Sequence, residues 1–538
     1  METGGSTFFN ERASLSMRSV ADGGVAVESN DGSVMLMTES NDIEEGAVVI
    51  DPNEAIQAEL YEGGELVEDA KVVVEEDEEH WDPKTRRRLR ILQVVVVCFS
   101  IAGMIGVVVS GVTGFGNSSK VTPEPVITGW KSVGDQIFLP NVEEPLEQFG
   151  SALVISQDGN SLIATAPGVS MDALNRNIGQ AKLMQVGESA QQVNGSVAFS
   201  WDVAHTMLGL GVNENPTSSL ASSSDLSVVA VGYPLVAGRT GRVQVFEADE
   251  YDSDTVLEFD INTTTVTGFG YAVDINSEGT LMAIGAPLYE PEPNALRGLV
   301  RIYRRQAQNI LGSQDEWIPV GDDILGMNDD EMLGWSLSLS NNRLVVGAPF
   351  FDIDRGLVRV YEILNDETFV QVGQDILGTQ VLGRFGESVS ISDDGTVLAI
   401  GARGSAFDYG HVMIYRVNGE GEWIADSQRL VGKQPGDGFG SNVALTGDAK
   451  HLAVGAPMNN AFGLDSGMVR VWKHQEDTNT WLQEGSDIGG TVGSNLGSSV
   501  ALTVNADGIL RVAAGGPSAD FDGSVIKAGS VSIYDRAE

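Results

Sequence analysis

The sequence predicts an all-β fold, a seven-bladed β-propeller ectodomain, preceded by one transmembrane α-helix and a disordered N-terminal tail. Three observations predict this arrangement. A paired motif, Phe-Gly followed by Gly-Ala-Pro, recurs after Trp130. A run of 22 uncharged residues, 91–112, precedes the repeats. A strand-like segment, residues 130–137, stands before the first copy of the motif and has no counterpart after the last copy.

The first element is an acidic tail, residues 1–83, with 22 Asp and Glu residues against three Lys and Arg. Low hydrophobicity combined with high net charge leaves too little apolar surface to offset the entropy of ordering the chain. We therefore expect a disordered tail. The whole chain has a formal net charge of −44, which argues against nucleic acid as a partner because phosphate neutralisation requires Lys and Arg.

The second element is the uncharged run 91–112, which at 1.5 Å per residue is long enough to cross a hydrocarbon core of about 30 Å. A basic juxtamembrane segment, residues 84–90, carries one Lys and four Arg, whereas the linker 113–127 carries only Lys120. The positive-inside rule then places the N-terminus in the cytoplasm and the C-terminal domain across the membrane. We expect a signal-anchored, single-pass type II protein of the plasma membrane or a secretory-pathway membrane.

Three N-glycosylation sequons agree with this orientation, because Asn117, Asn194 and Asn262 all fall on the predicted outer side. Two features of the membrane segment each allow two interpretations. The basic cluster is either a lipid-binding patch or only the topology signal. A stripe of small residues is either a homodimer contact between transmembrane helices or a chance product of a Gly-rich span; it comprises Ala102, Gly106, Ser110 and Gly114.

The third element is the repeat itself. Its first half stands at Phe149, Phe269, Leu333, Phe385, Phe439 and Leu496, each followed by Gly, with a worn copy at Pro216-Thr217. From the Gly to the Pro of the second half the step is 17 residues in four copies, in one of which Arg403 replaces Pro. A constant step in four of seven copies argues against coincidence and predicts one structural unit per copy.

Within each unit the hydrophobic pattern predicts four antiparallel strands. The first alternates, the second is continuously apolar like a strand buried on both faces, and the third alternates again. A fourth follows at 317–324, 369–376 and the segments that begin at Trp423 and Trp481. Four such strands repeated radially make a propeller blade. Because residues 130–137 match the fourth-strand pattern and the last unit lacks one, we expect this segment to complete blade seven and close the ring.

The paired motif resembles the FG-GAP repeats of the integrin α-subunit propeller and its relatives, over residues 128–538. This resemblance implies a seven-bladed propeller that binds protein or glycan ligands, in an adhesion or receptor role, and performs no chemistry. The family commonly inserts calcium loops between the first two strands of a blade. Here these turns are short and lack oxygen ligands at alternate positions, whereas calcium takes six to eight oxygens. We therefore expect hairpin turns, with no metal and no cofactor.

The candidate ligand-binding residues lie in the loops between second and third strands, where an aromatic residue recurs beside an acid. Exposed aromatic residues on a rigid ring are suitable contact anchors, although loop aromatics often simply pack. The candidates are Tyr289, Phe350, Phe351, Asp352, Phe407, Tyr409, Phe462, Phe521 and Asp522.

Enzymatic function finds little support, because the four histidines of the outer domain are scattered and no nucleophile or metal motif is present. Two alternatives to a binding role stay open. One is a passive structural scaffold in the secretory pathway. The other is a propeller glycosidase that gathers carboxylates from several blades around its axis.

Overall fold

In the computed structural model the chain forms two units, Met1–Val121 and Thr122–Glu538. The described residues are 16–20, 24–28, 34–37, 129–138, 147–168, 180–186, 191–193, 196–198, 201–208, 219–234, 240–247, 257–262, 266–293, 295–306, 316–364, 368–404, 407–520 and 527–537.

The first unit contains three short antiparallel strands in the order β1-β2-β3: β1 (Ser16–Val20), β2 (Gly24–Glu28) and β3 (Val34–Met37). At these strands the structure differs from the predicted disorder. Short runs such as Val34–Met37 are wholly apolar, and the acidic average over the whole tail conceals them. The rest of the predicted tail lies outside the described residues.

The predicted membrane segment, with the basic residues before it and most of the linker after it, also lies outside the described residues. No helix within the described part of the chain is long and apolar enough to cross a membrane. The transmembrane helix therefore stays a prediction.

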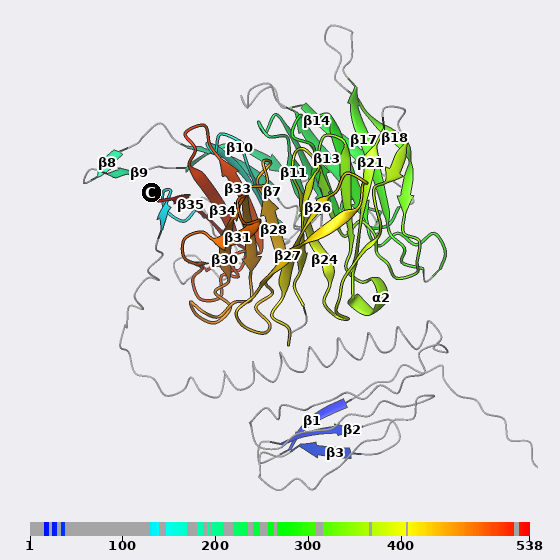
Figure 1. Cartoon of the computed structure of the whole chain (residues 1–538). Coiled ribbons are helices and arrows are strands. Elements are labelled where there is room, and N and C mark those ends of the chain that lie inside the picture. Colours follow the sequence, from blue (N-terminus) through cyan, green and yellow to red (C-terminus); the bar gives the residue numbers. More distant parts are fainter. Residues whose placement is uncertain are drawn as a thin grey trace, which may run out of the picture. The chain divides into compact units, whose positions relative to one another are not determined.

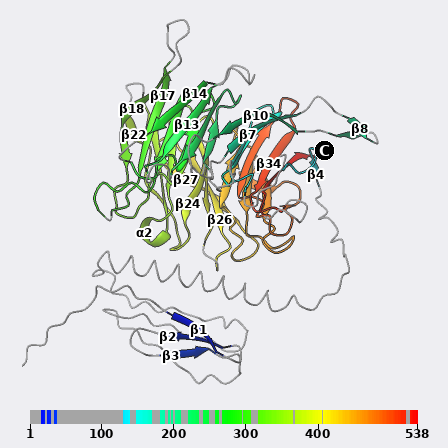
Figure 2. The ribbon, with the colours of Figure 1, turned by 180° about the vertical axis from the view of Figure 1, so that it is seen from behind.

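The second unit is a seven-bladed β-propeller, as predicted: seven antiparallel sheets stand side by side (Figure 1), and the view from behind shows the same arrangement (Figure 2). In blades 1 to 6 the strands follow chain order from the inside outward, and the innermost strands of successive blades are neighbours all around the ring.

Blades 1 to 3 are four-stranded, and a small hairpin, β8 (Gln191–Val193) with β9 (Ser196–Ala198), interrupts blade 1 before its last strand. Blade 1 comprises β5 (Leu153–Ile155), β6 (Ser161–Ala166), β7 (Gln180–Val186) and β10 (Trp201–Leu208). Blade 2 comprises β11 (Leu220–Ser222), β12 (Val228–Tyr233), β13 (Arg242–Glu247) and β14 (Leu257–Asn262). Blade 3 comprises β15 (Ala272–Ile275), β16 (Leu281–Ala286), β17 (Leu299–Gln306) and β18 (Glu316–Leu325).

In blades 4 and 6 the outer strand is broken into two pieces. Blade 4 comprises β19 (Ser336–Leu339), β20 (Arg343–Ala348), β21 (Leu357–Ile363), β22 (Phe369–Gln371) and β23 (Ile376–Leu377). Blade 5 comprises β24 (Phe385–Ile391), β25 (Val397–Ala402), β26 (His411–Val417) and β27 (Trp423–Val431). Blade 6 comprises β28 (Asn442–Leu445), β29 (His451–Ala456), β30 (Met468–Gln475), β31 (Thr480–Gln483) and β32 (Ile488–Gly489).

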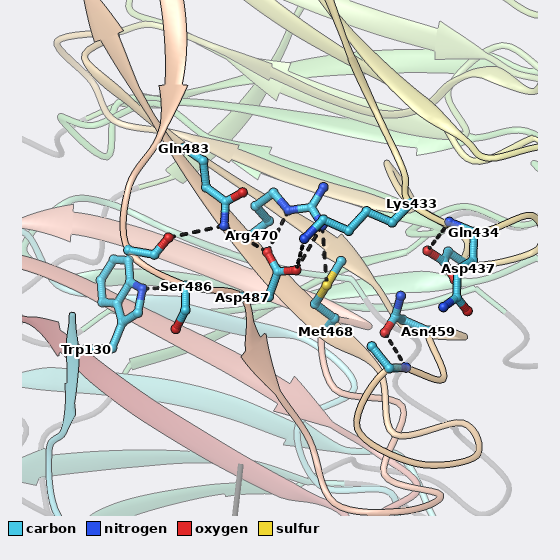
Figure 3. Close-up of polar contacts among 12 residues, drawn as sticks. Trp130, Lys433, Gln434, Asp437, Asn459, Met468, Arg470, Gln483, Ser486 and Asp487 are labelled. Atoms are coloured by element: carbon cyan, nitrogen blue, oxygen red, sulfur yellow. Dashed lines mark hydrogen bonds and ion pairs between the residues drawn. The ribbon is translucent and has the colours of Figure 1, made fainter. Parts of the chain in front are cut away.

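Blade 7 confirms the predicted closure. It comprises β33 (Ser499–Val504), β34 (Leu510–Gly516), β35 (Ser530–Arg536) and, from the start of the domain, β4 (Trp130–Ser132). Trp130 is buried and its indole Nε1 donates to the Ser486 carbonyl of blade 6 at 3.1 Å (Figure 3). Since β4 covers the edge of β35, the ring has no open strand at this point.

The hydrophobic core lies between the blades. Second strands such as β12, β16 and β25 are buried along their whole length, as predicted, because both faces meet a neighbouring sheet. The alternating first strands bury every second residue, as in β15 and β28. Each apolar cluster joins adjacent blades; one combines Val300 and Ile302 of blade 3 with Leu344 and Val346 of blade 4.

The structure explains why the two halves of the motif recur together. A Cβ at Gly285, the Gly of the second half in blade 3, would collide with the carbonyl oxygen of Gly334, the Gly of the first half in blade 4. The same contact joins Gly455 to Gly497 and Gly515 to Gly150. Only glycine permits this backbone approach between blades. The motif is therefore the blade-to-blade contact itself.

Candidate functional site

Two sets of loops meet at one end of the propeller. The Gly before a third strand pairs with the first-half motif of the next blade, as Gly298 does with Leu333 and Gly356 with Phe385. Loops between second and third strands therefore share a face with the blade-to-blade connections, and we call this end the motif face. The candidate aromatic residues that the structure describes belong to loops of this face. The short helix α2 (Phe351–Asp354) marks it in Figures 1 and 2.

Three candidate aromatics pack inward. Tyr289 lies against the apolar cluster of blades 2 and 3, Phe351 against that of blades 3 and 4, and Phe462 against that of blades 5 and 6. These residues pin their loops to the blades, so the packing interpretation describes them better than the contact interpretation.

Two candidate aromatics face solvent: Phe407 is 84% exposed and Tyr409 45% exposed. Asp352 forms an ion pair with Arg355 at 2.9 Å. Phe521 and Asp522 lie outside the described residues. So do the sequons at Asn117 and Asn194, whereas Asn262 is the last residue of β14, the outer strand of blade 2.

The remaining candidate, Phe350, belongs to a ring stack on the motif face. Its ring lies 4.6 Å from that of Trp335 in an edge-on arrangement, and Trp335 lies 4.6 Å from Tyr271. Tyr271 and Trp335 each follow the Phe-Gly or Leu-Gly of their blade, so they sit at the start of an innermost strand, next to the propeller axis. All three rings are partly exposed.

Four charged residues complete this cluster. The Arg384 guanidinium lies 5.1 Å from the centre of the Phe350 ring, a cation–π contact, and 3.7 Å from the Asp354 carboxylate. Arg403, the residue that replaces Pro in the motif of blade 5, lies 3.4 Å from Glu387. We call the seven residues together the mouth cluster: Tyr271, Trp335, Phe350, Asp354, Arg384, Glu387 and Arg403.

The electrostatics of the mouth cluster keep its phenol protonated. Burial raises the pKa of the Tyr271 hydroxyl above its usual value, and the Glu387 carboxylate raises it further, although Arg403 and Arg384 oppose this. The neutral hydroxyl is then both donor and acceptor at physiological pH. The cluster thus presents aromatic faces, a phenol, two guanidinium groups and two carboxylates.

The loop beneath Phe350 has a strained backbone. Asp352, Ile353 and Asp354 all have positive φ, at 50°, 57° and 55°, so α2 contains a left-handed turn. Such a conformation costs about 1–3 kcal/mol per non-glycine residue. The connection to blade 5 holds it, because the Arg384 amide donates to the Asp354 carbonyl at 2.7 Å. Backbone strain of this kind concentrates at functional sites.

The other side of the ring differs at the same positions. Blades 6, 7 and 1 carry Ser441, Ser498 and Ser151 where blades 3 to 5 carry Tyr271, Trp335 and Glu387. Each serine hydroxyl donates to a carbonyl three residues back, at 2.6 to 2.8 Å. These serines close their own turns. In blades 3 and 4 Tyr271 and Trp335 instead contact each other, and in blade 5 Glu387 forms an ion pair with Arg403.

An arc of exposed apolar side chains accompanies the mouth cluster on the motif face. It runs through the loops of blades 3 to 6 and the connection to blade 7. We call it the apolar arc: Met327, Ile353, Val381, Phe407, Tyr409, Met458, Leu464 and Val492. Apolar side chains exposed on one face of a protein offer contact area to a partner.

The acidic hairpin turns at the opposite end use their carboxylates internally. Asp394 accepts from the Ser392 hydroxyl at 2.6 Å and from the Thr396 amide at 3.0 Å, and Asp158, Asp225 and Asp448 repeat this pattern. Burial alone would raise the pKa of Asp394, but these hydrogen bonds hold it below its usual value. Within the described segments no three His, Cys, Asp or Glu side chains gather as metal ligands.

Three of the histidines serve local contacts. His411 bonds Arg429 at 2.8 Å, His451 pairs with Glu484 at 3.4 Å, and His474 bonds Arg416 at 3.1 Å. Burial, with Arg429 nearby, lowers the pKa of His411 to about 4. The predicted lack of catalysis stays a prediction.

Sequence reasoning missed most of the mouth cluster. It selected aromatic residues beside acids in the loops, whereas Tyr271, Trp335 and Glu387 stand inside the motif, directly after Phe-Gly or Leu-Gly. A signal was present: these large side chains break a position that is otherwise serine, and Arg403 breaks the motif's Pro in the same blade as Glu387.

Comparison with known proteins extends no further than the architecture. No family model matches the chain, and no curated protein matches it. Among solved structures it is similar to hydrazine synthase of Kuenenia stuttgartiensis, with 12% identity and a TM-score of 0.43, over 70% of this chain and 95% of that one. It is also similar to the periplasmic gluconolactonase PpgL of Pseudomonas aeruginosa, with 14% identity and a TM-score of 0.41, over 64% and 86%. At such low sequence identities and TM-scores, the roles of residues in those proteins say nothing about residues of this chain.

Proposed function

We propose that the propeller is the ligand-binding domain of a single-pass type II membrane protein, with an adhesion or receptor role and a ligand that is a protein or a glycan. The observation that carries the proposal is the one-sided mouth of the ring. Aromatic and charged side chains from three blades gather there, while the equivalent residues of the opposite blades close their own turns.

Two further features support a binding role. The apolar arc lies on the same face as the mouth cluster, and ligand sites combine apolar and aromatic surface with a few polar groups. The closed ring holds these loops on rigid strands, which lowers the entropy lost on binding. The resemblance of the motif to FG-GAP repeats implies the same role, although the motif residues themselves form the contacts that fix one blade to the next.

The binding proposal is tested with the full chain in lipid nanodiscs on protein and glycan arrays. We expect at least one ligand that protects the backbone amides of the motif-face loops from hydrogen exchange. The hairpin turns at the other end, such as residues 505–509, serve as the internal control and should exchange unchanged. A ligand that protects only those turns contradicts the assignment of the face, and a lack of any ligand favours the scaffold alternative.

The topology proposal has a separate test. Protease is added to sealed vesicles of known orientation that contain the full chain, tagged at both ends. We expect the N-terminal tag to resist digestion from the outer side and the propeller to be accessible only from that side. Digestion of both ends from one side contradicts the proposed orientation.

A further inference from the structure

Blades 3, 4 and 6 share an ion pair between the third strand and the outer strand segment. In blade 3 the Arg301 guanidinium donates to both oxygens of the Asp323 carboxylate, at 2.6 and 2.7 Å. The same two-point pair recurs in blades 4 and 6, as Arg359 with Asp375 and as Arg470 with Asp487 (Figure 3). Because both charges of each pair meet within one blade, these pairs hold strands together and are structural.

Blade 5 departs from this pattern at both positions. In blades 3, 4 and 6 the arginine stands three residues after a glycine, and the aspartate three residues before a second glycine, whose amide donates to the carbonyl of the first. In blade 5 these glycines are Gly410 and Gly432, which bond at 3.1 Å. The equivalent residues are Met413, which packs against the apolar cluster of blades 4 and 5, and Arg429. A positive charge thus stands where the other blades have a negative one.

Arg429 is held in place by uncharged groups. Its Nη2 donates to the side-chain oxygen of Gln380 at 3.0 Å and to Nδ1 of His411 at 2.8 Å. His411 is buried, and its pKa, lowered to about 4, keeps the ring neutral at physiological pH, so that Nδ1 is an acceptor. Arg429 itself is exposed, whereas Arg359 and Arg470 of the structural pairs are 1% and 2% exposed.

The donors that Arg429 has left suit a carboxylate. Both contacts use Nη2, so the N–H groups of Nε and Nη1 have no partner among the described residues. Arginine forms strong charge-assisted hydrogen bonds with carboxylates. A guanidinium whose position is already fixed also loses little side-chain entropy when it binds one. The two neutral contacts therefore orient Arg429 toward a charge that this blade does not supply.

Apolar side chains surround Arg429. Val431 lies two residues further along β27, on the same exposed face of the strand, and Val381 is the neighbour of Gln380. The loop before β26 lies beside the end of β27, through the bond between Gly432 and Gly410. It carries the two exposed aromatics of the apolar arc. We call these residues together the blade-5 rim: Gln380, Val381, Phe407, Tyr409, Arg429 and Val431.

The composition of the blade-5 rim favours a protein partner over an acidic glycan. Arginine and exposed aromatic residues are the side chains that most often dominate protein–protein contacts. A glycan carboxylate would bring hydroxyl groups with it, and the valines and the Phe407 ring beside Arg429 leave hydroxyls without hydrogen-bond partners. A protein segment can instead place apolar side chains on either side of one acid.

We propose that the blade-5 rim binds an acidic segment of a partner protein, with a carboxylate on Arg429 and apolar side chains of that segment on the exposed aromatic and aliphatic residues beside it. This inference rests on the proposed binding function, and it names the partner class and its place on the motif face.

The test selects a phage library of random linear peptides on the full chain in lipid nanodiscs. We expect the selected peptides to be enriched in Asp or Glu next to aromatic or aliphatic residues. Synthetic copies of them should bind Arg429→Asp more weakly by about tenfold or more, because attraction becomes repulsion at the contact. Arg429→Lys, which keeps the charge, should weaken binding less.

A double variant separates loss of the contact from loss of the fold. Met413→Arg combined with Arg429→Asp gives blade 5 the ion pair of blades 3, 4 and 6. It should melt no lower than the wild type and should still fail to bind the acidic peptides. Arg297→Ala is the matched control, because it removes an arginine of the same face that already pairs with Asp329 at 3.0 Å. It should leave peptide binding unchanged.

Selected peptides without acidic enrichment, or acidic peptides that the double variant still binds, would overturn the inference. Binding that depends on Arg429 but is confined to acidic glycans on an array, or to a second copy of the chain in light scattering, would overturn the partner class. A ligand that protects the motif-face loops and is indifferent to Arg429→Asp overturns the inference but leaves the proposed function standing. No ligand of any class overturns both.

Discussion

The two sides of the propeller mouth use the same backbone for opposite purposes. In blades 6, 7 and 1 the residue after the motif glycine is a serine that bonds its own turn. In blades 3 to 5 it is Tyr271, Trp335 or Glu387: the two rings contact each other across neighbouring blades, and Glu387 forms an ion pair with Arg403. A repeat architecture keeps the strands constant and varies a single position. In such an architecture the residues shared by all copies maintain the fold, so residues that differ between copies are the candidates for a binding site.

The largest expected effect is on the serine side, where the ring closes. Deletion of residues 130–137 leaves β35 as an uncovered edge and removes the buried Trp130. Loss of a buried Trp side chain alone costs about 3–5 kcal/mol. We expect the deleted chain to aggregate or to melt several degrees lower, measured by calorimetry and light scattering. An unchanged melting temperature would mean that another segment closes the ring.

A matched pair of substitutions compares the two sides directly. Asp487→Ala leaves Arg470, 2% exposed, as a buried charge without its main partner, at a cost of about 3–5 kcal/mol. Glu387→Ala removes a carboxylate of similar exposure, but Arg403 is 28% exposed and hydrates, so we expect a loss below about 1 kcal/mol. Denaturant unfolding measures both. Equal losses would show that the mouth pair is structural as well.

The third prediction concerns pH. Asp274, on the inner strand of blade 3, accepts from the Leu339 amide at 2.6 Å, where Ser338 and Ser390 of the next blades make the equivalent bond. Burial raises the pKa of Asp274 from 3.8 to about 7, against the hydrogen bonds from Leu339 and Ile275. The unfolded chain loses this proton near pH 4 and the folded chain near pH 7. The contribution of Asp274 to the free energy of unfolding therefore decreases as pH rises from 4 to 7 and is constant above that range.

The variant Asp274→Asn should remove this dependence. We expect the melting temperature of the wild type to decrease more between pH 4 and pH 7.5 than that of the variant. Ser338→Ala, which removes the neutral counterpart, is the control and should leave the slope with pH unaltered. Parallel curves for wild type and Asp274→Asn would show that the carboxyl group ionises normally.

The smallest expected effect is on the acidic hairpin turns. Asp158, Asp225, Asp394 and Asp448 already accept hydrogen bonds within their turns. Only a ligand bound to the native state shifts stability. A chelator should leave the melting curve of the full chain within error of the curve in millimolar calcium. A downward shift that calcium but not magnesium reverses would reveal a site in loops such as the one with Asp352 and Asp354.

Much of the fold could be predicted from the sequence, because its cause is local and periodic. The seven copies, the four strands of each and the closing segment follow from motif spacing and apolar alternation. The three short strands of the first unit were missed, because composition averaged over a long tail conceals short runs such as Val34–Met37. An average of charge and hydrophobicity over many residues does not show that short neighbouring segments can pair as β-strands.

The mouth cluster could not be predicted in the same way. Its contacts join residues 15 to 64 positions apart, the widest being Tyr271 with Trp335, and no local period says which of these side chains meet. From the sequence, the aromatic residues beside acids in the loops are interpreted as ligand contacts. For Tyr289, Phe351 and Phe462 the structure gives a simpler reason, because these side chains pack against the blades. Phe350 alone belongs to both sets.

The closing strand has a mechanical consequence. Everything that precedes Gly129 enters the propeller through β4, which pairs with β35 at only three positions, Trp130 with Arg536, Lys131 with Asp535 and Ser132 with Tyr534. A second bridge follows at Ile137 with Val531. A tensile load applied to the N-terminal part of the chain reaches the propeller through this short seam. The seam therefore carries the pull before the strands of blades 1 to 6 do.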